Sequence, residues 1–355
     1  MTDKEQWPTG RVAEELGPWF SAKLGQPVTV TQLSRTSEGF SWVNYTLTVR
    51  ASDPAAGGPA AGEPRTWDFA IRQEPDDGVL APYDTRWQYT LNRAVALQKA
   101  VPVPEIYWLE TDPAVLGRPF YVMERMRGEV PTPDVQQPFR PEERSRLAGQ
   151  LVDHLVSIHR IDWAGADFEG VLRKPATAGQ AASDELELWT EFYERAALTE
   201  IPAVQLGLSW LRAHQAASGT LVFCHGDYRN GNFMVDGGNI SAIFDWELAH
   251  VGDPVEDLGW CSMRAFQGRS GLVAHLLTET EFIAGYEART GLRVDPEVLR
   301  FWRVLGNLKA LGSYIRGCRA FEERRTSDLR LASFGHRGLY LIKGILDEIG
   351  YGAAR

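Results

Sequence analysis

The residues best suited to chemistry lie in one polar stretch and at one acidic position beyond it. The stretch is His225-Gly-Asp227-Tyr-Arg-Asn-Gly-Asn232, and the acidic position is Asp245, in Asp245-Trp-Glu247. A carboxylate such as Asp227 could accept a hydrogen bond from a substrate hydroxyl and take its proton late in a transfer reaction. The oxygens of Asn232 and Asp245 are ligands that Mg²⁺ prefers beside the phosphates of ATP. The set therefore predicts phosphoryl transfer, in which positioning and charge stabilisation matter more than covalent catalysis.

Each of these residue types also has a purely structural use. Asp, Asn and Gly gather in turns because they tolerate turn backbones and hydrogen-bond to them. What favours a function is the joint order of a short strand, the polar stretch, a strand hairpin and an Asp at the hairpin exit. A strand is predicted over 221–224, and strands over 233–235 and 240–244 flank the turn Asp236-Gly-Gly-Asn239. The hairpin would bring the two candidate metal ligands to the same place.

The elements upstream of this region form a pattern of strands with two helices. Apolar residues at helical spacing predict helices over 11–24 and 84–100, the second stopped by prolines. An Ala/Gly/Pro-rich segment over 51–64 indicates a loop. Five strands are predicted, over residues 28–33, 43–49, 67–72, 106–109 and 119–124. This order predicts an antiparallel N-terminal nucleotide-binding lobe over residues 1–126, which includes the first helix.

The remainder of the chain reads as mainly helical. Helices are predicted over 141–159, 183–197 and 204–216, and again from residue 253 to the end. We therefore expect a C-terminal lobe over residues 127–355 that carries catalysis and acceptor binding. The fold class is predicted to be α+β, with a small antiparallel β lobe and a larger helical one.

Composition excludes several classes of protein. The chain has 355 residues, 44% of them hydrophobic and 24% charged, which is typical of a soluble globular protein. Its 37 basic and 47 acidic residues give a net charge of −10, which argues against nucleic-acid binding and leaves room for a cationic substrate. Three cysteines without a paired spacing fit a reducing compartment. With neither a signal core nor an apolar run long enough to span a bilayer, we expect a cytoplasmic enzyme without a membrane partner. The oligomeric state stays open.

The sequence resembles the aminoglycoside phosphotransferase family, whose relatives include choline kinase and the kinase domains linked to acyl-CoA dehydrogenases. The motifs that carry the resemblance are His225-Gly-Asp227 with Asn232, Ile243-Phe-Asp245-Trp-Glu247, Gly252-Asp-Pro-Val-Glu-Asp257-Leu258, Val101-Pro-Val-Pro104 and Gly117-Arg-Pro-Phe-Tyr-Val-Met-Glu124. Together they cover roughly residues 28–260, and they are nearest to the acyl-CoA dehydrogenase-linked kinase domains. The resemblance implies a protein-kinase-like fold of two lobes that binds ATP and Mg²⁺.

The same resemblance implies roles for particular residues. Asp227 is the expected catalytic base, and Asn232 and Asp245 are the expected magnesium ligands. Asp257 would be a buried support of the catalytic loop, and His225 would brace that loop. The segment from Glu124 to Met126 would be the hinge beside adenine, which it would touch mainly through backbone groups.

The phosphate-binding part departs from the family pattern. Kinases of this kind place a Lys on the third strand, but residues 24–98 contain none, so Arg72 is the candidate phosphate ligand. Residues 75–104 also lack a Glu to pair with it, which leaves Asp84 or Gln88 as substitutes. Backbone amides near Gly39 and Ser41, in the loop before the second strand, could cradle an anion, and an ordinary turn explains these residues equally well.

The acceptor is predicted to be a hydroxyl of a small molecule. Only residues 246–256 separate Asp245 from Asp257, too few for a segment that docks a polypeptide. An acidic helix over 184–194 could attract an aminoglycoside, although its spacing is also that of a solvated face. The likeness of residues 245–254 to the acyl-CoA dehydrogenase-linked kinases implies that a hydroxyacyl thioester or another metabolite is as plausible an acceptor as an antibiotic. Basic residues over 316–325 could meet an anionic substrate or lie on a charged surface. Four aromatic residues could line the acceptor pocket or fill the core, namely Trp260, Phe266, Trp302 and Tyr314.

Two alternative functions use parts of the same set. A nucleotide-binding kinase-like module would bind ATP without turnover, which would fit the missing Lys and Glu. An intact Asp227 favours catalysis, since a module that only binds has no evident need for a base. A metal-dependent hydrolase would use histidines and carboxylates that lack a close spacing such as His-Glu-x-x-His. Its candidate residues are His225, Asp227, Asp245, His250 and Asp253.

Overall fold

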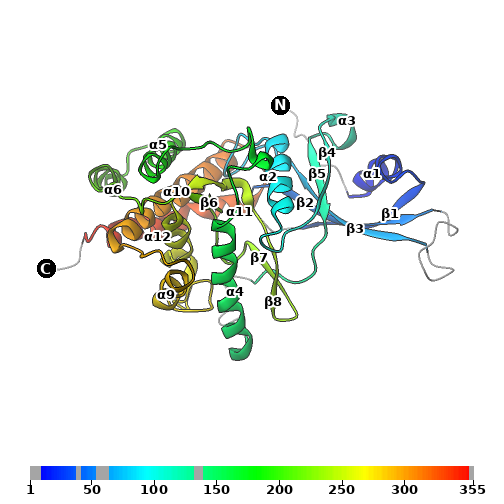
Figure 1. Cartoon of the computed structure of the whole chain (residues 1–355). Helices are drawn as coiled ribbons and strands as arrows, with labels where there is room; N and C mark the ends of the chain where they lie inside the picture. The colour runs from blue at the N-terminus through cyan, green and yellow to red at the C-terminus, as the bar shows by residue number, and fades with distance from the viewer. Residues whose placement is uncertain (1–8, 37–40, 53–63, 132–138, 352–355) are drawn as a thin grey trace. The chain divides into compact units, whose positions relative to one another are not determined.

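A computed structural model of the chain describes residues 9–36, 41–52, 64–131 and 139–351 (Figure 1). The chain forms two compact units. The N-terminal unit comprises Met1–Asp77, Ala81–Arg93 and Pro104–Met126, and the C-terminal unit comprises Gly78–Leu80, Ala94–Val103 and Arg127–Arg355. The assignment of nucleotide binding to residues 1–126 and of catalysis to 127–355 stays a prediction.

The N-terminal unit is built on one antiparallel sheet with the strand order β1-β2-β3-β5-β4. The strands are β1 (Val28–Thr36), β2 (Val43–Ala51), β3 (Thr66–Gln73), β4 (Ile106–Glu110) and β5 (Phe120–Glu124). Burial alternates along β2 because successive strand residues point to opposite faces of the sheet. Helix α1 (Thr9–Leu24) packs its apolar side on this sheet, where Phe20 stacks on Phe69 with ring centroids 5.1 Å apart. The five predicted strands and the first helix are confirmed.

Two helices lie between these strands in the sequence. Helix α2 (Thr85–Gln98) confirms the prediction over 84–100. The single turn α3 (Pro113–Leu116) was not predicted, because four residues are too few to show helical periodicity. Its start is capped by the Asp112 carboxylate, which accepts a hydrogen bond from the Ala114 amide at 2.8 Å, and Gly117 ends it in the left-handed region.

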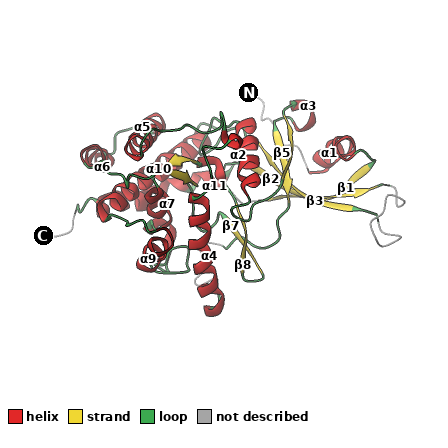
Figure 2. Cartoon of the chain, in the orientation of Figure 1, coloured by secondary structure: helices red, strands yellow, loops and turns green. Residues whose placement is uncertain are grey.

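Helices dominate the C-terminal unit (Figure 2). They are α4 (Pro141–His159), α5 (Ala178–Ala196), α6 (Pro202–Ala213), α7 (Pro254–Cys261), α8 (Arg264–Gln267), α9 (Glu279–Thr290), α10 (Pro296–Glu322), α11 (Leu329–Ala332) and α12 (Phe334–Glu348), with short 3₁₀ turns at Ala166–Phe168 and Trp246–Leu248. Helix α10 packs against α5, α7 and α12, so it is buried along much of its length. Two small antiparallel pairs complete the unit: β6 (Val222–Cys224) with β9 (His250–Gly252), and β7 (Phe233–Asp236) with β8 (Asn239–Ile243).

The predicted α+β class is confirmed, and most differences lie at the ends of elements. Helix α5 begins at Ala178, earlier than predicted, because the Thr177 hydroxyl caps it by accepting a hydrogen bond from the Gln180 amide at 3.1 Å. Strand β9 was missed, since three residues carry no alternation and the strand exists only through its pairing with β6. No helix among the described residues is long and apolar enough to cross a membrane.

Candidate active site

The polar stretch of the sequence forms a tight loop directly after strand β6, and we call residues 225–232 the Asp227 loop. Its backbone turns at Gly226, where φ is +77°. A Cβ atom at this position would lie 2.2 Å from the carbonyl oxygen of Leu248, so only glycine fits. The close approach brings the Asp227 loop against the segment that follows the β7–β8 hairpin.

Three side chains hold the carboxylate of Asp227. The indole Nε1 of Trp260 donates to Oδ1 at 2.7 Å, and Nε of Arg229 donates to the same oxygen at 2.8 Å. The amide Nδ2 of Asn232 donates to Oδ2 at 2.6 Å and to the backbone carbonyl of Asp227 at 2.8 Å. Asp227 itself is 9% exposed. Its carboxylate is therefore fixed in direction while part of it stays accessible.

The β7–β8 hairpin brings the other two predicted residues together. Phe233 pairs with Ile243 across the hairpin, and the Phe244 amide donates to the Asn232 carbonyl at 2.8 Å. Asn232 thus precedes one strand while Asp245 follows the other. Asp245 has φ of +68°, a left-handed conformation that Asp tolerates better than most residues. The structure therefore places Asn232 beside Asp227 and Asp245 at the exit of the same hairpin.

The donor atoms of this site fit a magnesium ion. Nδ2 of Asn232 is already used by Asp227, so the amide oxygen is the atom that remains for a metal. With the carboxylate of Asp245 it offers two hard oxygens, and Mg²⁺ is usually held by one or two protein oxygens together with phosphates and water. Asp245 also acts electrostatically on His225 and Arg229, which places its charge close to the Asp227 loop.

Asp257 on helix α7 supports the Asp227 loop by hydrogen bonds to its backbone, the role that the resemblance implied. Its Oδ2 accepts hydrogen bonds from the His225 amide at 2.7 Å and from Nε2 of His159 at 3.0 Å, and its Oδ1 accepts from the Gly226 amide at 2.9 Å. Asp257 is fully buried. Burial alone would raise the pKa of this carboxyl, but the hydrogen bonds outweigh it and lower the pKa to about 2.

His225 braces the loop through both ring nitrogens. Nε2 lies 2.9 Å from the Phe244 carbonyl, to which it donates, while Nδ1 accepts from the Asp227 amide at 3.2 Å. This pattern fixes the neutral tautomer with the proton on Nε2. Burial lowers the pKa of His225, which agrees with a neutral ring. Its contacts are those of a structural residue.

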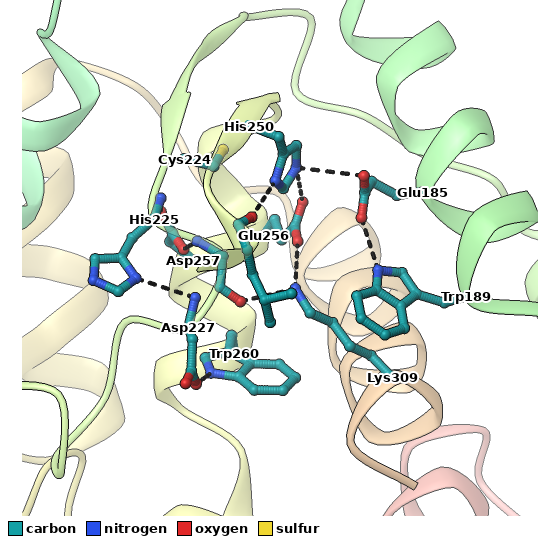
Figure 3. Close-up of polar contacts among 12 residues, drawn as sticks. Glu185, Trp189, Cys224, His225, Asp227, His250, Glu256, Asp257, Trp260 and Lys309 are labelled. Atoms are coloured by element: carbon teal, nitrogen blue, oxygen red, sulfur yellow. Dashed lines mark hydrogen bonds and ion pairs between the residues drawn. The ribbon is translucent and has the colours of Figure 1, made fainter. Parts of the chain in front are cut away.

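A charged cluster, buried except for the half-buried His250, was not predicted from the sequence. It contains Lys309 on α10, Glu256 on α7, His250 on β9 and Glu185 on α5, and we call it the Lys309 cluster (Figure 3). Nζ of Lys309 donates to the Gly226 carbonyl at 2.8 Å and lies 3.3 Å from Oε1 of Glu256. Oε2 of Glu256 lies 3.0 Å from Nε2 of His250. The sequence signal was a single Lys in the apolar helical stretch 304–312.

Neighbouring opposite charges shift the pKa values of two members of the Lys309 cluster, His250 and Glu256. Burial alone would lower the pKa of His250, but the carboxylates of Glu185 and Glu256 raise it to about 10. Burial would likewise raise the pKa of Glu256, and His250 and Lys309 lower it. A solvated face was one of the two interpretations of the acidic helix over 184–194, and it does not hold for Glu185, which is buried. It turns inward because its position also faces His250 and the indole N–H of Trp189, which donates to it at 2.8 Å.

The predicted nucleotide-binding residues lie in the N-terminal unit. Arg72 is on β3, is largely buried, and has its guanidinium 5.4 Å from the centre of the Trp42 ring. Ser41 is buried beside Trp42, whereas Gly39 lies outside the described residues. Glu124 ends β5, with its amide donating to the Glu105 carbonyl at 2.8 Å, and Met126 follows half-buried. Their predicted roles stay predictions.

The two candidate partners for Arg72 have local contacts of their own. The Asp84 carboxylate accepts a hydrogen bond from the Trp87 amide at 3.0 Å, at the start of helix α2. Gln88 is buried, and its side-chain oxygen accepts from Nδ2 of Asn92 at 3.2 Å. The Asp84 side chain thus makes a local hydrogen bond at the start of α2, and the Gln88 side chain makes one within the helix.

The four aromatic residues proposed for an acceptor pocket divide between roles. Trp260 is buried and bonded to Asp227, while Phe266 is half-buried with the Arg229 guanidinium 5.1 Å from its ring centre. Trp302 is buried in α10, and Tyr314 stacks on Phe334 at 4.3 Å. The first two therefore lie beside the Asp227 carboxylate, and the other two have packing roles.

The basic and metal-binding alternatives gain no support from the arrangement. Glu323 pairs with Arg319 at 2.9 Å and with Arg325 at 2.8 Å, so both of these arginines have a local carboxylate partner. The residues proposed for a hydrolase do not share one site: His250 faces Glu256, whereas Asp253 caps α7 by accepting from the Val255 amide at 2.8 Å. Cys224 is buried next to these groups, and burial raises the pKa of its thiol.

Comparisons with known proteins agree with this geometry. The model of the phosphotransferase enzyme family (APH) matches residues 61–302, more than half of the chain. Acyl-CoA dehydrogenase family member 10 of Mus musculus is 27% identical over 196 residues, which are 54% of this chain and 18% of that relative. The chain thus spans about a fifth of that relative's length.

Two solved structures share the fold. A putative aminoglycoside phosphotransferase from Ralstonia eutropha JMP134 superposes with a TM-score of 0.70 at 23% identity, over 94% of this chain and 97% of the other. A thermostable mutant of aminoglycoside phosphotransferase APH(4)-Ia, in a ternary complex with ADP and hygromycin B, gives a TM-score of 0.62 at 14% identity, over 96% and 100%. The expected kinase-like fold is confirmed. Because the family match runs through the Asp227 loop, the β7–β8 hairpin and Asp257, the chain belongs to the phosphotransferase enzyme family.

Proposed function

We propose that this protein transfers the γ-phosphoryl group of ATP to a hydroxyl of a small molecule. The observation that supports this most is the meeting of three groups: the fixed carboxylate of Asp227, the amide of Asn232 bonded to it, and Asp245 at the exit of the adjoining hairpin. These lie within the region that matches the phosphotransferase enzyme family.

In the proposed reaction Asp227 orients the acceptor hydroxyl and takes its proton as the new P–O bond forms. The hydrogen bonds from Trp260 and Arg229 keep the carboxylate in one direction, which is how a positioning residue contributes to this chemistry. Asn232, through its amide oxygen, and Asp245 would hold Mg²⁺, which when bound neutralises charge on the ATP phosphates.

The N-terminal unit would supply the nucleotide contacts. We assign Arg72 to the phosphates, Gly39 and Ser41 to the backbone cradle around them, and Glu124 to Met126 to the adenine side. Support for Arg72 is its position on β3, the third strand, where the family pattern places its phosphate-binding Lys. The APH(4)-Ia structure, which contains ADP, supports an adenine nucleotide for a chain of the same fold.

Two classes of acceptor stay in the proposal. The complex of APH(4)-Ia with hygromycin B supports an aminoglycoside-like acceptor. The likeness to acyl-CoA dehydrogenase family member 10 supports a hydroxyacyl compound or another metabolite. The three free cysteines support a reducing, cytoplasmic location.

The test is release of ADP from Mg-ATP across a panel of acceptors, with a labelled γ-phosphate followed into the product. The panel contains aminoglycosides, hydroxyacyl-CoA compounds, choline-like alcohols and sugar alcohols. Asp227→Asn should remove the transfer, whereas Asp236→Asn, at an exposed hairpin position of the same unit, should leave it unchanged.

The outcomes separate the two readings of the site. Transfer to one class of acceptor that Asp227→Asn abolishes would establish the kinase and its substrate class. ATP binding without transfer to any acceptor, equal in the wild type and in Asp227→Asn, would favour the nucleotide-binding module. Failure to bind Mg-ATP at all would overturn the proposal.

A further inference from the structure

The ammonium group of Lys309 lies in an unusual position for a lysine. The residue is 3% exposed, and its Nζ sits between two indole rings, 5.1 Å from the centre of Trp189 and 4.9 Å from that of Trp260 (Figure 3). A buried ion pair contributes little net stability, and apolar residues of the same volume often serve as well or better. Stability alone therefore does not explain a lysine here, and its contacts point to another role.

The first contact reaches the peptide bond that joins Gly226 to Asp227. Its oxygen accepts from Nζ of Lys309 at 2.8 Å, and its N–H donates to Nδ1 of His225 at 3.2 Å. This peptide plane is thus held at both its oxygen and its nitrogen. Because Gly226 has φ of +77° and no side chain, the plane would otherwise be the freest point of the loop. A change in ψ of Gly226 would displace Asp227 and change the direction of its carboxylate.

The second contact reaches the carboxylate of Asp227 itself. The ring of Trp260 lies against the Lys309 ammonium, and its Nε1 donates to Oδ1 of Asp227 at 2.7 Å. A cation on the face of an indole is attracted to the ring and draws electron density from it, which makes the N–H a better donor. Lys309 therefore acts on both the backbone and the side chain of Asp227.

The rest of the cluster places carboxylates around this buried amine. Glu256 faces Lys309 at 3.3 Å and His250 at 3.0 Å, and Glu185 lies 3.8 Å from His250. Two cations and two carboxylates then balance one another, with the Leu248 carbonyl accepting from His250 Nδ1 at 2.9 Å. The cluster joins α5, α7, β9 and α10 at one point behind the Asp227 loop.

We propose that Lys309 is the positioning residue for Asp227, acting through the Gly226 carbonyl and the Trp260 indole. This inference rests on the proposed phosphotransferase function. Lys309 does not touch the reacting groups. It sets the orientation in which the Asp227 carboxylate receives the acceptor hydroxyl, and displacement of such a group by about 1 Å lowers the rate by roughly 100-fold.

The test uses two variants, each with a matched control in the full-length chain. Lys309→Met removes the charge and the donors while keeping the chain length, and Lys343→Met removes an exposed lysine that pairs with Asp347 on α12. Trp260→Phe removes the indole N–H that bonds to Asp227. Trp302→Phe makes the same change at another buried indole, whose Nε1 has no hydrogen-bond partner within the described residues.

Two readouts are measured for every variant. Hydrogen exchange of peptides covering residues 225–232 should be about 10-fold faster in Lys309→Met, with exchange in α4 and α9 unchanged. In ADP release from Mg-ATP, kcat should fall about 10- to 100-fold in Lys309→Met and about 5- to 20-fold in Trp260→Phe, with KM for ATP within about 3-fold of the wild type. Both control variants should match the wild type.

A merely structural role would give a different result. Loss of active protein with an unchanged kcat per folded molecule, or unchanged exchange over 225–232, would overturn the proposal. If Lys309→Met loosens the entire C-terminal unit, Trp260→Phe decides, and a kcat equal to that of Trp302→Phe would overturn the route through the indole. Should the wild type release no more ADP than Asp227→Asn, the proposed function fails, and hydrogen exchange alone then decides whether Lys309 holds the loop.

Discussion

Replacement of Asp257 by Asn should strongly destabilise the C-terminal unit while leaving its surface unchanged. The carboxylate accepts three hydrogen bonds inside the protein, from the amides of His225 and Gly226 and from the ring of His159. An asparagine side chain offers one oxygen and one NH₂ group in the same space. Its NH₂ group would face at least one buried donor, so that one or two N–H groups lose their acceptor.

The magnitude follows from these contacts. A buried donor left without an acceptor costs about 1–3 kcal/mol, and bonds to a charged acceptor are each worth about 1.5–3 kcal/mol. We therefore expect Asp257→Asn to lower the free energy of unfolding by about 3–5 kcal/mol at pH 7. This is a large share of the stability of an ordinary domain.

The pKa of Asp257 adds a second, independent expectation. Its folded value of about 2 lies below the ordinary 3.8, so its contribution is present above pH 4 and is lost as the pH falls through 2. The full contribution of this difference is about 2 kcal/mol, of which about 1 kcal/mol is lost by pH 3. The asparagine variant has no such group, so its deficit relative to the wild type should shrink by about 1 kcal/mol between pH 7 and pH 3.

Urea unfolding followed by circular dichroism and by hydrogen exchange of α7 peptides measures both quantities. Asp295→Asn is the matched control, because Asp295 also accepts a backbone amide at a helix start but is exposed, and Asn caps helices equally well. The control should change stability by less than about 0.5 kcal/mol. A loss below about 1 kcal/mol in Asp257→Asn at pH 7 would show that the loop does not depend on this carboxylate.

Three further predictions concern single positions. His250→Gln should flatten the fall of the melting temperature between pH 7 and pH 10. In the wild type the raised folded pKa of about 10 gives a contribution to stability that is complete below pH 6.5 and is lost as the pH rises through 10. A series of thermal melts that runs parallel to the wild type would contradict this. Asp245→Asn should raise the Mg²⁺ concentration needed for half-maximal ADP release about 10-fold or more, since Asn tolerates the left-handed backbone but lacks the charge. An unchanged Mg²⁺ titration would exclude Asp245 from the proposed metal site. Gly226→Ala should lower the free energy of unfolding by about 3 kcal/mol or more in urea titrations, because its Cβ would lie 2.2 Å from a carbonyl oxygen. Gly237→Ala, also at positive φ but in open space, should lower it by only about 1–2 kcal/mol. Equal losses at the two sites would refute the steric reason.

Elements whose signals are local could be predicted from the sequence. Helix α4 has the predicted ends, Pro141 and His159, because a proline opens its first turn, acidic residues follow it, and apolar residues recur at helical spacing. The β7–β8 hairpin was predicted from the Gly-Gly turn between two apolar runs, and both glycines have positive φ, as such turns require. Local backbone preferences and the periodicity of side chains act within a few residues, so they can be recognised directly in the sequence.

The candidate site was predictable to the extent that its residues are close in the chain. Asp227, Asn232 and Asp245 are joined by one loop and one hairpin, so their spacing alone brings them together. The burial of Glu185 could not be predicted, because it depends on contacts that are distant in the chain. Helical period tells which residues share a face, but it does not tell which face another helix will cover with a histidine and an indole.

The sequence by itself determined the α+β class, the order of the elements and the polar residues that could transfer phosphate. Only the tertiary structure decided how the Asp227 carboxylate is held. Lys309 and Gly226 are 83 positions apart, and Trp260 and Asp227 are 33 apart, yet each pair is within hydrogen-bond distance. Such contacts depend on how α7 and α10 pack, and a lone lysine in an apolar helix reveals its role only when the groups that face it are known.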